Sequence, residues 1–410
     1  MELVRKLYLR VYLLVMMLYV FLNKGVAYTY LVEFLWISGI AMLVLNRKKY
    51  YIIWRKETKL LLFFIGLSAL YIIKGIPNYS FIDLVRDSFI FQYGWFAFII
   101  LLYSNEVNII WDELFKIYKW FPLVALVNFI LQYYVPFFET IRPFGGIPIL
   151  LFKNGDMGVH LLISTLLMLL NLNKLSWKWQ LGLLVLIIFD FLTLSAYSRS
   201  GMLAYLIGLI AYLFFAKGKV VTANNNLKKY IPWALLIVIP LYLSIQVGEN
   251  FQGRAVGVGQ LKENITSMAS TADDVTLEQN VIWRILWWTN IIDYSFTKQY
   301  FFTGKGLGMS LAQTDDVITG DEELRSPHNF HLNIMARFGV IIFTLWVYWL
   351  YLLFNPLFKR KLKTNSVAIS CILLAFIVNA SFDVFLEGPM GAFPFWTWVG
   401  LFFITEDSPV

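Results

Sequence analysis

The sequence predicts an all-α polytopic membrane protein. Of its 410 residues, 59% are hydrophobic and 15% are charged, whereas a soluble domain carries about 25% charged residues. The hydrophobic residues form uninterrupted blocks close to the ~20 residues that cross the hydrocarbon layer of a bilayer. Amphipathic stripes, the pattern of a soluble helical bundle, do not describe these blocks. We therefore expect one polytopic domain over residues 1–410 with about 12 transmembrane helices.

The predicted spans follow the apolar blocks along the chain. They lie at residues 7–22, 28–45, 60–76, 88–103, 119–137, 157–172, 179–196, 201–216, 230–247, 330–354, 366–382 and 392–405. The first block contains Arg10 and lacks a small-residue cleavage site, so we expect a first span and not a cleavable signal peptide. The single cysteine, Cys371, lies in a late block, which excludes an internal disulfide and a cysteine-rich metal site.

Lysine and arginine gather in the connections after the even-numbered spans, as in 47–59, 174–178, 217–229 and 359–363. Under the positive-inside rule these connections and both termini face the cytoplasm. The basic residues are dispersed among short loops, so they indicate topology and exclude a nucleic-acid partner. The long polar and acidic segment 248–329 then becomes a large extracytoplasmic loop, which we expect to carry short amphipathic helices.

Arginine dominates the predicted external side. The external arginines are Arg86, Arg142, Arg199, Arg254, Arg284 and Arg325. Guanidinium grips phosphate through a planar bidentate fork, so this bias favours an anionic, phosphate-bearing ligand. Surface ion pairs with the acidic residues of the loop are the competing interpretation for each arginine.

Two predicted spans begin on the external side next to such arginines. The segments Ser198-Arg199-Ser200-Gly201 and Ser326-Pro327-His328-Asn329 both resemble helix starts, with serines available as N-caps and Pro327 suited to the first helical position. Helix N-termini offer free N–H groups to phosphate. The residues predicted to bind substrate and pyrophosphate are Arg199, Arg284, Arg142, Arg325, Asn329 and His331.

His328 is the predicted catalytic residue. In the first turn of a helix the dipole disfavours imidazolium, which leaves a neutral base ready to accept a proton. A merely exposed histidine is the competing interpretation. His328 and His331 lack a third ligand at diagnostic spacing, so we expect no metal and no cofactor.

The sequence does not assign a single role to three carboxylates. Asp190 lies inside the seventh predicted span, where an ionisable group is costly unless it is paired. Asp383 and Glu387 lie at the outer end of the eleventh span. Either of these two could pair with arginines or contact sugar hydroxyls.

The order and spacing of several motifs resemble the O-antigen ligase and O-antigen polymerase superfamily. These motifs are Ser198-Arg-Ser-Gly201, Trp283-Arg284 followed by Asp293, Thr303-Gly-Lys-Gly-Leu-Gly308, and Ser326-Pro-His-Asn-Phe-His-Leu332 running into Arg337-Phe-Gly339. The pair His328-Asn329 with Gly339 about ten residues later fits the ligase pattern.

The resemblance implies a helical fold like that of the lipid-dependent (GT-C) glycosyltransferases. It implies transfer of oligosaccharide from undecaprenyl pyrophosphate to an acceptor hydroxyl at the outer face of the bacterial plasma membrane, without nucleotide sugars. His328 would remove the acceptor proton, and Arg199 and Arg284 would neutralise the departing pyrophosphate.

The leading hypothesis is a polymerase of polysaccharide repeat units. The close alternative is a ligase that hands glycan to a lipid A core or another acceptor. A lipid-oligosaccharide transporter or flippase is the distant alternative, and it should place ionisable residues near the bilayer midplane. The expected partners are the lipid-linked oligosaccharide, an acceptor glycan or glycolipid, membrane lipids and a chain-length regulator.

Overall fold

The computed structural model describes residues 2–21, 30–46, 54–135, 137–141, 154–216, 225–245, 256–269, 275–297, 299–317, 324–359 and 362–407. The regular elements in these ranges are helices. In chain order they are α1 Glu2–Leu18, η1 Tyr19–Phe21, α3 Leu31–Leu45, α4 Lys56–Gly75, α5 Phe81–Gln92, α6 Trp95–Ile100, η2 Leu101–Glu106, α7 Val107–Tyr118, α8 Phe121–Tyr134, α9 Phe137–Thr140, α10 Asn154–Leu170, η3 Leu172–Lys174, α11 Trp177–Tyr197, α12 Arg199–Phe215, α14 Asn225–Ser244, α15 Val258–Ala269, α16 Val275–Thr297, α17 Leu311–Thr314, α18 Phe330–Phe358, α19 Thr364–Ala380, η4 Phe385–Glu387 and α20 Pro389–Asp407.

The helices have the length and surface of membrane spans. Five helical segments of the described chain are long and apolar enough to cross a bilayer, namely Lys56–Gly75, Trp95–Tyr134, Trp177–Tyr197, Leu227–Ser244 and Phe330–Phe358. Large apolar side chains such as Leu236 of α14 lie on the outside with 64% of their surface exposed, which suits lipid and not water. The prediction of an all-α membrane protein is confirmed; about 12 spans and a GT-C-like fold stay predictions.

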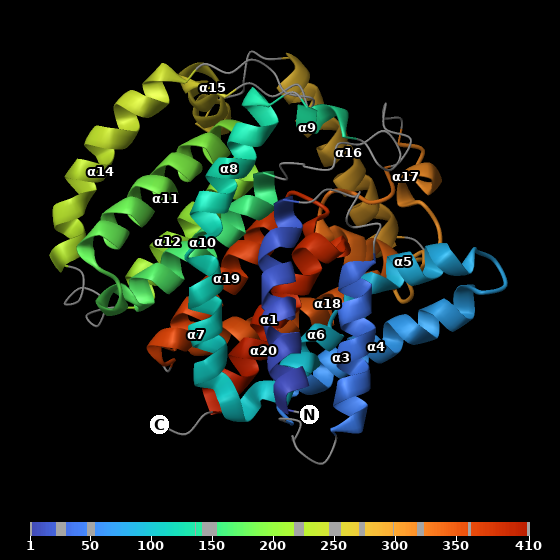
Figure 1. The fold of residues 1–410 in the computed structure, drawn as a ribbon. Helices are drawn as coiled ribbons and strands as arrows, with labels where there is room; N and C mark the ends of the chain where they lie inside the picture. The colour runs from blue at the N-terminus through green and yellow to red at the C-terminus, as the bar shows by residue number, and fades with distance from the viewer. Residues whose placement is uncertain are drawn as a thin grey trace.

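The predicted span at 88–103 is not one helix. It is divided among α5, α6 and η2, with a break at Tyr93 and Gly94 and a second irregularity at Tyr103. As a result, α5 begins before the apolar block and contains Asp83, Arg86 and Asp87. α5 folds back against α4, and the two form the hairpin at the right of Figure 1.

Close backbone contacts align three helices around one end of the molecule. A methyl group at Gly158 of α10 would lie 2.3 Å from the carbonyl oxygen of Gly201 in α12, and one at Gly155 would lie 2.8 Å from Oδ1 of Asn379 in α19. Small residues allow such contacts between membrane helices. The starts of α10 and α12 therefore lie beside the end of α19.

The loop helices and the ends of the chain lie at opposite ends of the fold. In Figure 1, α1 begins and α20 ends at the lower end, whereas α9, α15 and α16 lie at the upper end. The predicted topology requires this separation. Which end faces the cytoplasm stays a prediction.

The segment 248–329 contains α15, α16 and α17, and its second half is folded around a small core of its own. Trp287, Ile291 and Leu311 are buried together there. Lys305 forms a largely buried ion pair with Asp315, and Trp287 Nε1 donates a hydrogen bond of 2.6 Å to Asp315 Oδ2. This part of the loop is therefore held to α16 by packing and by the Trp287 hydrogen bond, and the ion pair ties the loop to itself.

α18 is bent at Gly339, where φ is 84° and ψ is 174°. This backbone conformation is essentially restricted to glycine. The bend frees the carbonyls of Ala336 and Arg337, which accept hydrogen bonds of 2.8 Å and 2.9 Å from the N–H groups of Lys305 and Gly306. The glycine-rich segment 303–308 thus docks against α18 and holds the backbone around Arg337.

Candidate active site

A pocket of about 410 Å³ lies where α5, the turn before α18, α18 itself and the segment 383–390 meet. Its lining brings together residues more than 200 positions apart in the chain. The lining residues are Arg86, Asp87, Ile90, Asp156, Leu324, Arg325, Ser326, His328, Asn333, Arg337, Asp383, Val384, Phe385, Glu387, Gly388, Pro389 and Met390.

His328 lines this pocket with 25% of its side chain exposed, and its Nδ1 lies 3.6 Å from Oδ1 of Asp383. The ring of Trp283 meets the imidazole edge to face at a centroid distance of 5.9 Å. Trp288 Nε1 donates a hydrogen bond of 2.7 Å to the carbonyl of Pro327. α16 therefore fixes both the backbone and the ring of the histidine.

The backbone at His328 is left-handed, with φ at 51°. Such a conformation is uncommon outside glycine, and strained residues of this kind cluster at functional sites. The turn allows Asn329 to cap α18, because Asn329 Oδ1 accepts hydrogen bonds of 3.0 Å and 3.1 Å from the N–H groups of His331 and Leu332. The expectation that Pro327 starts the helix is wrong, since α18 begins at Phe330.

Arg284 lies next to the segment that carries Asp383. Its Nη1 is 3.4 Å from the carbonyl oxygen of Phe382, and its guanidinium lies over the ring of Trp283 at 5.4 Å. One helix, α16, thus contacts both the His328 turn and the Asp383 segment. Arg284 flanks the pocket and is not among its lining residues.

Arg199 is the first residue of α12, and Ser198 caps this helix as the sequence predicts, accepting a hydrogen bond of 3.1 Å from Gly201 N. A methyl group at Gly155 would lie 3.3 Å from Oγ of Ser200, and the next residue, Asp156, lines the pocket. The start of α12 is therefore a neighbour of the pocket on its α10 side.

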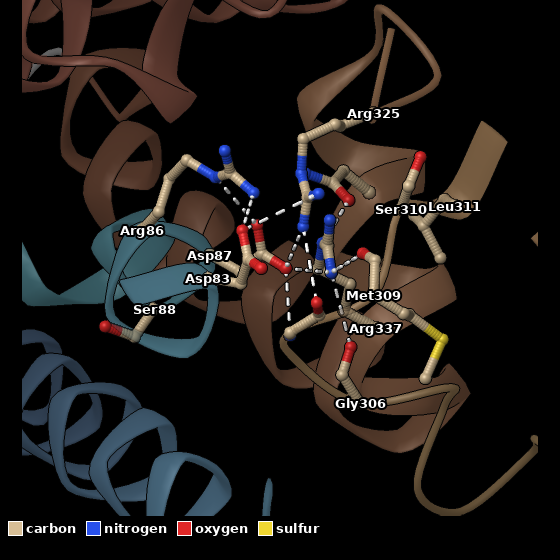
Figure 2. Close-up of polar contacts among 12 residues, drawn as sticks. Asp83, Arg86, Asp87, Ser88, Gly306, Met309, Ser310, Leu311, Arg325 and Arg337 are labelled. Carbon is tan, nitrogen blue, oxygen red and sulfur yellow. Dashed lines mark hydrogen bonds and ion pairs between the residues drawn. The ribbon is translucent and has the colours of Figure 1, made fainter. Parts of the chain in front are cut away.

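A network of ion pairs and hydrogen bonds surrounds Asp87 of α5. Asp87 accepts hydrogen bonds from Arg337 Nη1 at 2.8 Å, from Gly308 N at 2.9 Å and from Arg325 Nη2 at 3.4 Å. Figure 2 shows the guanidinium groups of this network gathered around the carboxylates of Asp83 and Asp87. Asp87 thereby joins α5 to α18 and to the glycine-rich segment.

The cations of this network differ in exposure. The side chain of Arg337 is 2% exposed, and its Nε donates to Asn333 Oδ1 at 2.9 Å. Arg325 is 27% exposed and lies 3.8 Å from Asp83; Arg86 is half exposed and also pairs with Asp83. Arg325 and Arg86 can therefore reach a ligand, whereas Arg337 has a structural position.

Glu387 of η4 also lines the pocket. Its Oε1 is buried and has no hydrogen-bond partner among the described residues. Burial raises the pKa of the Glu387 carboxyl from 4.5 to about 7, and the nearby Ser326 hydroxyl and Arg337 and His328 side chains limit the rise because they favour the carboxylate. Glu387 can therefore change its charge near neutral pH.

Other predicted residues lie away from this centre. His331 Nδ1 accepts a hydrogen bond of 3.0 Å from Trp346 Nε1, and neither His331 nor Asn329 lines the pocket. Asp190 is buried in α11, where its Oδ2 has no hydrogen-bond partner in the described part of the chain. Arg142 and Arg254 lie outside the described residues. Within the ranges that the structure describes, no cluster of three His, Cys, Asp or Glu side chains could hold a metal ion.

Residues 181–347 match the O-antigen ligase family model. The resemblance to the O-antigen ligase and polymerase superfamily is thereby confirmed. The matched region contains Arg199, Arg284 and His328, the three residues to which the resemblance gives roles. The O-antigen ligase match thus covers residues 181–347 of a chain whose described part contains five helical segments long and apolar enough to cross a membrane. No curated protein and no solved structure matches the chain.

The pocket also uses residues outside the O-antigen ligase region, and the sequence reasoning gave no role to some of them. Asp87 and Asp156 carried no signal, because each lies at the polar edge of an apolar block and its partners are distant in sequence. Arg337 had a signal of its own, since a charged residue inside a predicted span is costly without a partner. That cost pointed to a buried carboxylate, which the structure identifies as Asp87.

Proposed function

We propose that this O-antigen ligase-type protein is a glycosyltransferase that polymerises polysaccharide repeat units. It would transfer oligosaccharide from undecaprenyl pyrophosphate to an acceptor hydroxyl at the outer face of the bacterial plasma membrane. The observation that carries the proposal is the pairing of His328 with Asp383 beside a pocket that Arg284 flanks. A base, an orienting carboxylate and a cation for the leaving group are the parts that such a displacement needs.

In the proposed reaction His328 takes the proton of the acceptor hydroxyl. Asp383 faces Nδ1 at 3.6 Å, so Nε2 remains for the acceptor. The acceptor oxygen forms a bond to the anomeric carbon while the bond from that carbon to the pyrophosphate oxygen breaks. The anomeric configuration inverts, and the pyrophosphate leaves with the lipid.

Arg199 and Arg284 would stabilise the negative charge that develops on the departing pyrophosphate. Arg199 starts α12, where the free N–H groups and the positive end of the helix dipole also favour phosphate. Arg284 presents its guanidinium beside the Asp383 segment. Arg142, Arg325, Asn329 and His331 remain proposed binding residues, with Arg325 the member that lines the pocket.

The ligase alternative shares this leaving group and differs in the acceptor, and the description of the matched family model favours it. Purified protein supplied with undecaprenyl-pyrophosphate-linked repeat units separates the alternatives. A ladder of longer glycans on the lipid carrier is expected for a polymerase. Product that forms only after addition of an acceptor lipid would identify a ligase. Movement of unchanged donor across proteoliposomes, without glycan transfer, would identify a transporter and overturn the proposal.

A further inference from the structure

The arginines of the pocket already have acidic partners. Its lining carries four carboxylates and three guanidinium groups. The guanidinium groups of Arg325 and Arg337 already pair with Asp87, and that of Arg86 pairs with Asp83. The remaining acidic and polar groups of the lining are Asp383, Glu387, Ser326 and Asn333. Ser326 and Asn333 lie close to the Glu387 carboxyl, and Asn333 also accepts a hydrogen bond from Arg337.

This arrangement suits hydroxyl groups better than anions. Carboxylate and amide oxygens accept hydrogen bonds from hydroxyls, whereas an anion would face like charge in a partly enclosed site. The volume of about 410 Å³ is within the range of small-molecule sites. The pocket therefore has the chemistry of a sugar site and not that of a pyrophosphate site.

One oxygen of Glu387 is independent evidence that the pocket holds a hydrogen-bonding ligand. Its Oε1 is buried without a hydrogen bond in the described structure, although buried polar atoms nearly always have one. The same side chain lines the pocket. A ligand hydroxyl in the pocket would satisfy this oxygen.

We propose that the pocket is the acceptor subsite and that it selects an uncharged sugar residue, with Glu387 accepting a hydrogen bond from a ring hydroxyl. The name acceptor subsite rests on the proposed transferase function, because it relies on His328 as the base in the same pocket. Arg199 and Arg284, to which the proposed function assigns the departing pyrophosphate, do not line the pocket; Arg325, which does line it, is already paired with Asp87. Donor phosphate and acceptor sugar would thus occupy separate places on either side of His328.

The selectivity should depend on pH through Glu387, whose pKa burial raises to about 7. Below that pH the carboxyl is neutral and tolerates an anionic sugar; above it the carboxylate repels one. Arg337 and His328 act directly on the Glu387 carboxyl. The other charged groups that line the same pocket are Asp383, Arg325, Arg86, Asp87 and Asp156. A Glu387→Gln variant keeps all of these and isolates the contribution of Glu387.

The test measures sugar binding to the purified full chain by saturation-transfer NMR. The probes are the methyl β-glycosides of glucose and galactose and those of the corresponding uronic acids, at pH 6 and pH 8. At pH 8 we expect the Kd of a uronic acid glycoside to be at least about ten times that of its uncharged counterpart. This ratio should shrink at pH 6.

Glu387→Gln should reduce the ratio at pH 8 and remove its change with pH. Glu263→Gln, at an exposed position of α15, is the matched control and should behave as the wild type. Equal binding of both classes to the wild type, no binding of any uncharged glycoside, or an unchanged ratio in Glu387→Gln would each overturn the subsite. If the glycosides bind as expected but no glycan is transferred from the lipid-linked donor, the sugar site stands and the transferase proposal fails.

Discussion

His328 combines an unusual backbone with a partly exposed side chain. The left-handed turn at φ 51° is held by the Asn329 cap on one side and by the Trp288 hydrogen bond to Pro327 on the other. Holding a non-glycine residue there costs of order 1–3 kcal/mol. Backbone strain of this kind favours a functional role for His328.

We predict that His328→Asn abolishes glycan transfer. Asparagine tolerates a left-handed backbone, so the fold and the binding of lipid-linked donor should persist while the base is lost. The measurement compares product formation with donor binding for the same preparation. Wild-type transfer rates in this variant would remove His328 from the chemistry.

Arg199→Lys should reduce transfer by at least about tenfold, because a point charge does not reproduce the bidentate guanidinium fork. Arg10→Lys is the control, since Arg10 pairs with Glu113 in another part of the fold. Steady-state kinetics with lipid-linked donor would separate the two variants. Equal rates would show that Arg199 does not contact the pyrophosphate.

Glu387 gives a pH dependence of stability with a defined sign. Because burial raises the pKa of Glu387 from 4.5 to about 7, the folded chain holds this proton more tightly than the unfolded chain. Its contribution is therefore complete below pH 4.5 and is lost as the pH rises to 7, by roughly 3 kcal/mol. Melting in detergent from pH 4.5 to 8 should show this loss in the wild type relative to Glu387→Gln; parallel curves would contradict it.

At the residue level, the sequence identified groups with a local signal and missed those whose partners are distant. His328 and Arg199 stand beside helix-start patterns, so they could be singled out. Asp87 acquires its significance from contacts with residues about 240 positions away, such as Arg325. Glu387 could be named from its place at the end of a span, but not its contact with Ser326, about 60 positions away. Hydropathy and spacing contain no such information.

Among the elements, the bend in α18 brings two sequence motifs into contact. The sequence contained Arg337-Phe-Gly339 and the glycine-rich segment 303–308 as separate motifs. The structure joins them, since the Gly306 N–H donates to the carbonyl of Arg337 at 2.9 Å. A methyl group at Gly339 would lie 3.0 Å from Gly304 N and 2.6 Å from the carbonyl oxygen of Phe301. These motifs shape the site, and Arg337 is the member that lines the pocket.

Gly339→Ala should therefore destabilise the protein by at least about 1–3 kcal/mol, the cost of a non-glycine residue in that backbone region, and the close contact adds to it. Gly66→Ala in α4 is the matched control, because a methyl group there meets no atom within 4 Å. Thermal unfolding in detergent measures the difference. Similar melting temperatures for the two variants would contradict a required bend.

Across the described part of the molecule, hydropathy located most apolar blocks on helices, because a bilayer imposes length and composition on any span. It placed 88–103 in one span, and the structure divides that block after Tyr93. Composition alone gave no sign of that break. The side of the membrane on which each loop lies was inferred from charge alone.

Labelling of single cysteines tests that topology. Cys371 is buried, so the native background should be silent to a membrane-impermeant maleimide. We expect Lys262→Cys in α15 to react in intact cells. Lys359→Cys after α18 should react only once the membrane is permeabilised. If both cysteines react from the same side, α15 and the basic loop after α18 lie on one side of the membrane, which contradicts the proposed topology.

The contact between Asp87 and Arg337 also bears on how far residues 181–347 can be treated as an autonomous module. Asp87 belongs to α5, outside the matched region, yet it is the carboxylate that compensates the buried guanidinium of Arg337. A fragment or chimera that carries the region without α5 would retain an uncompensated cation in its interior, at a cost of about 3–5 kcal/mol. A chimera that exchanges residues 181–347 between relatives would therefore need to include α5, whose Asp87 neutralises Arg337.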